Sequence, residues 1–207
     1  MWRSIIKAAA VFLLAVFLAP GHGFAEGPAK KRLVVIGVKN EIREKEWNDQ
    51  LIGYGLSHLL LQKLFDTGRY APVEDNPEIV AAVQKMIQNQ WQGDEPLYRA
   101  EDAGRIAGQL SCDAVAYARA VCFATRRVRG LAGPFSGAKT TVEIEIEVYV
   151  KEKDKPVVSA MGKGEACTRS LGVFFQIRED KVYFDETTVG KAAALAMEKA
   201  VSELRLP

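Results

Sequence analysis

The segment from Thr141 to Lys151 alternates strictly between apolar and polar residues. Successive side chains of a β-strand point to opposite faces, so a period of two predicts a strand with one buried face and one open face. We interpret the glutamates on the open face as a solvated surface rather than a metal or ligand site. The buried face carries Val142, Ile144, Ile146, Val148 and Val150, and the open face carries Glu143, Glu145, Glu147 and Tyr149.

The segments before and after this strand, residues 114–125 and 157–167, alternate in the same way. We therefore expect an antiparallel meander of three strands, with small residues on the core side that let helices approach closely. On the open face, Arg119 and Lys163 lie across from the glutamates in this arrangement. The small residues expected on the core side are Ala114, Ala116, Ala118, Ala120, Cys122 and Ala124 in the first segment, and Val158, Ala160, Gly162, Gly164 and Ala166 follow the same pattern in the second.

The rest of the chain predicts two more strands and four helices. A continuous apolar run over residues 32–38 is typical of a buried strand, and residues 70–74 predict a second short strand. Apolar residues at helical spacing predict helices over residues 48–67, 76–91, 99–110 and 189–204. The element order βαβααβββα predicts a single-domain α/β sandwich over residues 26–207, with a mixed sheet, a C-terminal antiparallel three-strand meander and helices mainly on one face.

Residues 1–25 have the pattern of a secretory signal peptide. Arg3 and Lys7 precede an apolar stretch, and small residues lead to a cleavage site after Ala25. No cysteine follows the apolar stretch, so we do not expect a lipoprotein, and the stretch is too short for a stable membrane anchor. The expected product is a soluble protein of the periplasm, without stable membrane insertion.

Charge gives no indication of nucleic-acid binding. The whole chain has 28 Lys and Arg against 26 Asp and Glu, and removing the predicted leader takes away Arg3 and Lys7. The mature chain is then neutral, which gives no electrostatic argument for a nucleic-acid partner.

The chain has three cysteines: Cys112, Cys122 and Cys167. An odd number leaves at least one thiol unpaired in a monomer, and the alternation places Cys122 toward the core and Cys167 toward the open side. We therefore favour buried small-residue roles over a structural disulfide. The spacing fits no zinc site, so we expect no metal.

No catalytic motif is present in the sequence. The one histidine after the leader, His58, lies within the first predicted helix without a partner at known spacing, and we interpret it as a partly buried helix residue. Gly130 to Gly137 is rich in glycine, but it links two strands, so we expect a hairpin loop rather than a phosphate site. We expect neither enzymatic activity nor a cofactor.

Two connections combine arginine or aromatic residues in the way that interface hot spots do. The first holds Arg126, Arg127 and Arg129 beside an apolar tip that includes Phe135. The second, from Leu171 to Phe184, predicts an amphipathic hairpin that turns at residues 178–180. Each connection either binds a partner protein or packs on its own domain. The predicted partner-binding residues are Arg126, Arg127, Arg129, Phe135, Phe174, Phe175 and Tyr183.

Three stretches together resemble the curli-export channel family (CsgG-like), and its relatives the TolB amino-terminal domain and the activators of penicillin-binding proteins (LpoB-like). The first is Leu-Phe-Asp-Thr-Gly-Arg-Tyr-Ala-Pro-Val-Glu at residues 64–74. The second is the helix-to-strand passage at residues 103–118, and the third runs from residue 171 through Tyr183 to the last helix.

The resemblance implies a protein that acts by protein–protein interaction in cell-envelope assembly or secretion, with envelope or secretion proteins, or further copies of itself, as partners. Channel members insert two long hairpins at the positions of residues 126–139 and 168–188. A membrane-spanning strand needs about 9–11 residues, and residues 126–139 are too few for two such strands and a turn. We therefore expect the periplasmic body without the membrane parts. The alternative is a ring-forming accessory subunit of an outer-membrane export channel.

Overall fold

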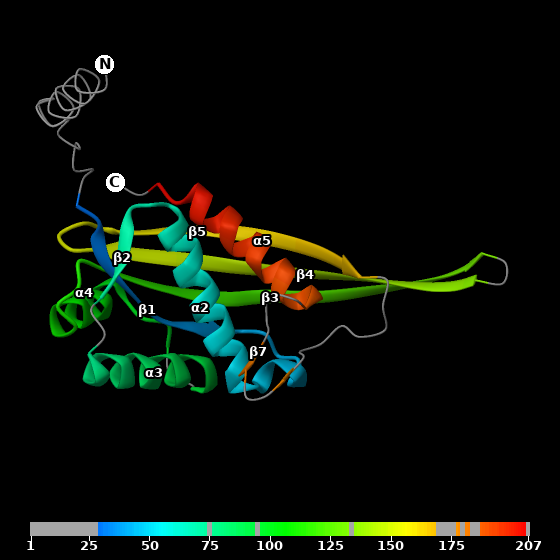
Figure 1. Cartoon of the computed structure of the whole chain (residues 1–207), viewed down its shortest axis with the longest axis horizontal. Helices are drawn as coiled ribbons and strands as arrows, with labels where there is room; N and C mark the ends of the chain where they lie inside the picture. Colours follow the sequence, from blue (N-terminus) through cyan, green and yellow to red (C-terminus); the bar gives the residue numbers. More distant parts are fainter. Residues whose placement is uncertain are drawn as a thin grey trace, which may run out of the picture.

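The computed structural model describes residues 29–73, 76–93, 96–132, 135–168, 177–178, 181–182 and 187–205. The predicted leader lies outside the described residues, as do Phe174, Phe175 and Tyr183. A mixed, curled sheet of five strands forms the centre of the fold (Figure 1), in the order β2–β1–β3–β4–β5. The strands are β1 (Lys31–Asn40), β2 (Tyr70–Pro72), β3 (Ala114–Ala132), β4 (Phe135–Glu152) and β5 (Val157–Thr168).

The helices begin and end close to the predicted residues. Asp49 caps the first long helix by accepting a hydrogen bond from the backbone of Leu51, and Asn76 caps the next one ahead of Pro77. Gly68 follows the first helix with a φ of 73°, a conformation that favours glycine. The helices are α2 (Gln50–Asp66), α3 (Pro77–Gln92), α4 (Ala100–Gln109) and α5 (Thr188–Glu203), and the short 3-10 helix η1 (Lys45–Asn48) precedes α2.

The strand pairing confirms the predicted mixed sheet. β1 runs parallel to both β2 and β3, while β3, β4 and β5 form the predicted antiparallel meander. A separate antiparallel pair, β6 (Ile177–Arg178) and β7 (Lys181–Val182), confirms the hairpin expected around residues 178–180. β7 lies near α2, so this hairpin returns toward its own domain.

The sheet has helices on both faces. α2 and α5 cover the face that carries the buried row Val142–Val150 and the alanines of β3, as predicted. α3 and α4 form a second layer over Val34, Ile36 and Val115 on the opposite face, which the alternation of β4 did not indicate. β1 is therefore buried on both sides, as its continuous apolar run requires.

A β-bulge in β3 changes which residues face the core. Ala120 pairs with Ile146, but the next pair is Cys122 with Glu145, so Val121 is an extra residue. Beyond the bulge, Phe123 pairs with Ile144 and lies on the core side, while Cys122 lies on the open side. The prediction that Cys122 and Ala124 face the core was therefore wrong, because an inserted residue reverses the alternation of every residue after it.

Within the described residues, no helix combines the length and apolar character needed to cross a bilayer.

Candidate functional site

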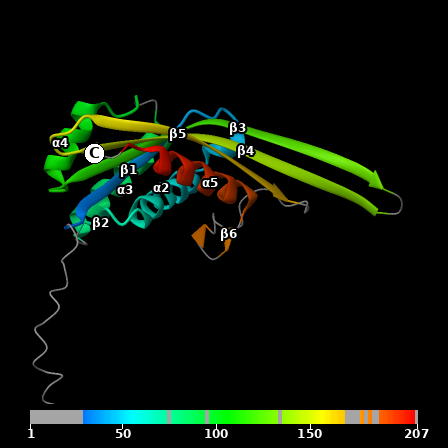
Figure 2. The same ribbon diagram turned by 90° about the horizontal axis from the view of Figure 1, so that it is seen from above.

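β3 and β4 stay paired with each other beyond the body of the sheet. Their pairing continues to Ala132 with Phe135, whereas β1 leaves β3 at Ala120 and β5 leaves β4 at Thr140. Residues 126–132 and 135–139, called the ribbon below, therefore pair with no other described strand and project away from the helices (Figures 1 and 2). Seven residues of strand extend about 23 Å.

The ribbon replaces most of the hairpin loop that the sequence predicted. Gly130 pairs with Gly137 inside the ladder, so the expected loop over these residues was too long. Backbone hydrogen bonds continue here even though the strict alternation of the sequence has ended. The alternation of the sequence predicted the buried part of the β3–β4 hairpin but not its exposed continuation.

The ribbon divides the predicted contact residues between its two faces. Arg126 and Val128 are exposed and lie on the open side, and the register position of Phe135 shares that side. Arg127 is exposed on the opposite side, the side that α5 covers further along, and the register position of Arg129 shares it. The structure thus places the three arginines on one element without gathering them on one surface.

Ion pairs on the open face of the sheet follow the predicted cross-strand arrangement. Arg119 lies 2.5 Å from Glu147, and this hydrogen-bonded contact raises the pKa of Arg119. Lys163 lies 2.5 Å from Glu143 and 3.5 Å from Glu145, and its contact with Glu143 raises the pKa of Lys163. Within the part of the chain that the structure describes, no group of three or more His, Cys, Asp or Glu side chains could hold a metal ion.

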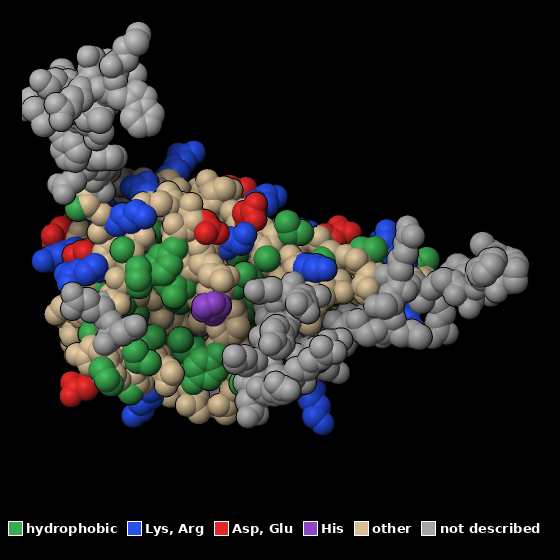
Figure 3. All heavy atoms as spheres, viewed as in Figure 1, with side chains coloured by type: hydrophobic (Ala, Val, Ile, Leu, Met, Phe, Trp, Pro, Cys, Tyr) green, Lys and Arg blue, Asp and Glu red, His purple; other side chains and the backbone are tan. Residues whose placement is uncertain are grey.

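An apolar groove of about 410 Å³ is lined by α2, α3 and β1. Its floor is β1 at Leu33–Val35, and its walls include Phe65 from α2 and Val83 from α3. His58 lines this groove, exposed on α2 among apolar side chains (Figure 3). The interpretation of His58 as a partly buried residue was therefore wrong. Val80, which the helical spacing groups with Ile79 and Val83 on the inward stripe of α3, is instead exposed at the groove.

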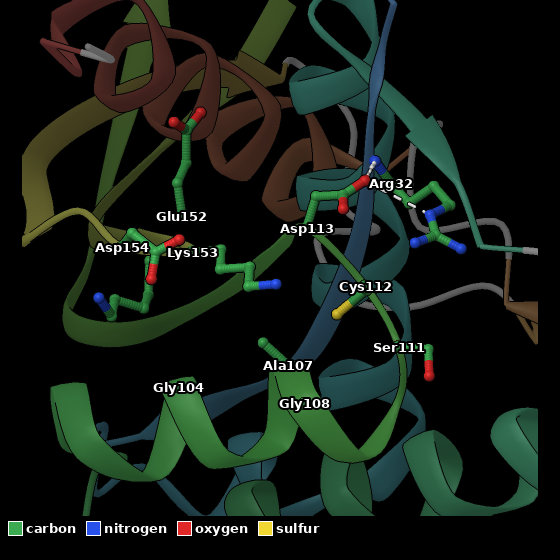
Figure 4. Close-up of a pocket in the computed structure, with 11 residues that line it drawn as sticks. Arg32, Gly104, Ala107, Gly108, Ser111, Cys112, Asp113, Glu152, Lys153 and Asp154 are labelled. Carbon is green, nitrogen blue, oxygen red and sulfur yellow. Dashed lines mark hydrogen bonds and ion pairs between the residues drawn. The ribbon is translucent and has the colours of Figure 1, made fainter.

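A polar cavity of about 600 Å³ lies between α4 and the turn after β4 (Figure 4). Asp113 accepts hydrogen bonds from the backbone and side chain of Arg32, which hold the pKa of its carboxyl below the usual range. Cys112 and Lys153 extend into the cavity. Burial raises the pKa of the Cys112 thiol, so the thiol is protonated at neutral pH, which is unfavourable for nucleophilic chemistry.

Glu152 also lines this cavity, but its buried carboxylate points away from Ala107 and Asp154 toward an ion cluster with partly exposed lysines. Its carboxylate is 3% exposed and accepts hydrogen bonds from Lys31, Tyr70 and Lys155. Burial alone would raise its pKa, but these hydrogen bonds outweigh burial and lower the pKa of Glu152 to about 2. The cluster joins β1, β2 and β4, so its role in the structure is to hold strands together.

No protein-family model and no curated protein matches the sequence. Among solved structures, the hypothetical protein CT253 from Chlamydia trachomatis is similar over 84% of this chain and 95% of its own, with 14% identity and a TM-score of 0.43. Lipoprotein GNA1162 from Neisseria meningitidis is similar over 69% of this chain and 85% of its own, with 13% identity and a TM-score of 0.40. These likenesses concern the fold.

Proposed function

We propose that the chain is an exported, non-enzymatic protein of the bacterial cell envelope, which contacts other proteins during envelope assembly or secretion. The ribbon is its contact element. The observation that carries this proposal is the projection of residues 126–132 and 135–139 beyond every other described strand and helix.

The composition and geometry of the ribbon fit a protein-contact element. Val128 is 54% exposed between Arg127 and the register position of Arg129, and arginine is enriched at protein interfaces. A two-stranded hairpin on its own is only marginally stable in water, so a partner that covers the ribbon would also stabilise it. The predicted signal peptide and the CsgG-like sequence stretches support an envelope location.

Site-specific crosslinking tests the ribbon directly. A photoreactive amino acid at Val128 is expected to form a defined crosslink to another protein in cells that export the chain. The same residue placed at Lys85, exposed on α3, serves as the control and should give no such product. Replacing Arg126 and Arg127 together by Ser should reduce the yield about tenfold, as for the loss of one interface hot spot. Equal crosslinking from both positions would contradict the proposal.

The second predicted contact set receives its own test. Replacing Phe174 and Phe175 by Ser is expected to reduce the same crosslink if the segment around β6 and β7 belongs to the contact surface. An unchanged crosslink would restrict the surface to the ribbon.

The alternative function is a ring-forming accessory subunit of an outer-membrane export channel. The observation in its favour is that both edges of the ribbon are unpaired among the described strands, so that copies could pair side by side. A closed ring of many copies by light scattering would support this alternative, and a monomer or dimer would contradict it.

A further inference from the structure

The ribbon carries positive charge without any negative charge. No Asp or Glu occurs between residues 114 and 142, while Arg126, Arg127, Arg129 and Lys139 all belong to the ribbon. Arg126, Arg127 and Lys139 are exposed, and none of them forms an ion pair within the described part of the chain. A projecting cationic element of this kind favours an acidic partner surface.

An acidic surface lies on the open face of the same sheet. Glu165 on β5 is directly opposite Glu143 on β4, and like charges in this position repel each other. Lys163 contacts Glu143 and Glu145, but no described cation pairs with Glu165. Two carboxylates therefore share one lysine while Glu165 has no described cation beside it, and an additional cation from outside would relieve the repulsion.

The basic and acidic surfaces occupy the same face of the sheet. β4 runs without a bulge from Lys139 to Glu145, so Lys139, Thr141, Glu143 and Glu145 all lie on the open side. Lys139 is four residues from Glu143, a distance of about 13 Å along a strand, which is too far for a direct ion pair. The open face is thus basic along the ribbon and acidic over the body.

We propose that the ribbon docks on the open sheet face of a second copy of this chain, forming a two-fold symmetric dimer. A two-fold axis that crosses β4 between Thr141 and Glu143 places Lys139 of each copy over Glu145 of the other. The same axis places Arg126 of each copy over Ala124 of the other, one strand away from Glu143. This inference rests on the proposed function, because it assigns a partner to the same ribbon.

The same axis also places the end of the ribbon. The register position of Phe135 then lies level with Tyr149 of the other copy, where Tyr149 stacks on Tyr117 with ring centroids 5.0 Å apart. Aromatic side chains in this region gain from further ring contacts. The ribbon of one copy would therefore cover the open face of the other copy, from the base of that copy's ribbon to its helix α4.

Charge reversal tests the dimer. The experiment uses residues 26–207, which lack the predicted leader and contain every described element. In sedimentation equilibrium at low salt, the original protein is expected to dimerise. The double variant Arg126→Glu/Lys139→Glu and the double variant Glu143→Lys/Glu145→Lys should each dissociate about tenfold more readily. An equimolar mixture of the two should associate again, because the charges are then complementary. The variant Lys85→Glu/Lys191→Glu makes the same charge change elsewhere on the exposed surface and should behave as the original protein does.

Added salt should weaken the dimer, since exposed charges beyond about 10 Å are screened at 0.1 M ionic strength. A monomer at all concentrations would overturn the inference, as would a dimer that both reversals leave unchanged. A monomer that binds anionic phospholipid vesicles through the ribbon would also overturn it and identify a lipid surface instead. If the protein is monomeric while Val128 still crosslinks to an envelope protein, the proposed function stands and the dimer does not.

Discussion

Gly164 on β5 and Ala192 on α5 lie so close that a Cβ atom at Gly164 would sit 1.9 Å from the backbone oxygen of Ala192. Gly162 has the same relationship to Ala196, one helical turn further along. These two contacts let the backbone of α5 rest on β5 without intervening side chains. The position of α5 on the sheet therefore depends on the absence of two side chains.

Gly164→Ala is expected to destabilise the protein by about 3 kcal/mol, because the helix must move away from the strand to admit the methyl group. Urea unfolding at neutral pH measures the change. Gly108→Ala is the matched control, since a Cβ at Gly108 meets nothing within 4 Å. This control should stabilise the protein by about 0.5 kcal/mol, because alanine is the better helix former. Equal effects at the two positions would show that α5 does not pack as described.

The sequence predicted small residues on the core side of β5 that let a helix approach closely, although it did not identify which helix, because a strand pattern indicates which face is buried. The row Val142–Val150 and the glycines of β5 each follow from a period of two, and both lie as predicted. The bulge at Val121 could not be predicted in the same way. It changes the alternation without any glycine or proline to mark it, so the sides of Cys122 and Phe123 were exchanged.

The candidate sites depend on contacts between distant segments, which a periodic pattern does not report. The groove beside His58 is lined by residues from α2, α3 and β1, and the cluster around Glu152 joins residues from three strands. The ribbon was predicted only as a loop, because its exposed strands need no apolar face. Its arginines were recognised from the sequence, but their division between two faces required the register.

Glu152→Gln is expected to remove a stabilising effect that depends on pH. The carboxyl has a pKa of about 2 in the folded protein and an ordinary value near 4.5 when unfolded. Its contribution is therefore fully present above pH 4.5 and is lost as the pH falls from 4.5 toward 2. The contribution is about 2 kcal/mol after allowance for the partly exposed lysines. The difference in unfolding free energy between the original protein and the variant should shrink by somewhat more than half of this amount from about pH 6 to about pH 3 and by most of the rest as the pH falls to about 2.

The control for this experiment is Glu203→Gln, which changes an exposed carboxyl at the end of α5. Its difference from the original protein should stay small throughout the same pH range. A constant deficit for Glu152→Gln would mean that the carboxylate is not held in its charged form by Lys31, Tyr70 and Lys155.

The three thiols are expected to react in a fixed order. Cys167 is exposed, Cys122 is half-buried and Cys112 is buried at 5% exposure. Burial also raises the pKa of Cys112, which lowers the fraction of reactive thiolate. Alkylation followed by mass spectrometry should label Cys167 first, then Cys122, and Cys112 only after urea is added. Early labelling of Cys112 in the native protein would contradict the described packing of α4 on the sheet.

Phe123→Ala is expected to destabilise the protein by about 2 kcal/mol, whereas Cys122→Ala should change its stability by less than about 0.5 kcal/mol. The reason is the bulge, which turns Phe123 toward the core, where its ring lies 4.9 Å from that of Trp47 in an edge-on arrangement. Without the bulge, the alternation would bury Cys122 and expose Phe123, and the two effects would be reversed. Thermal unfolding of both variants therefore distinguishes the two registers. A larger loss for Cys122→Ala would restore the simple alternation and would place Arg127, rather than Arg126, on the open face of the ribbon.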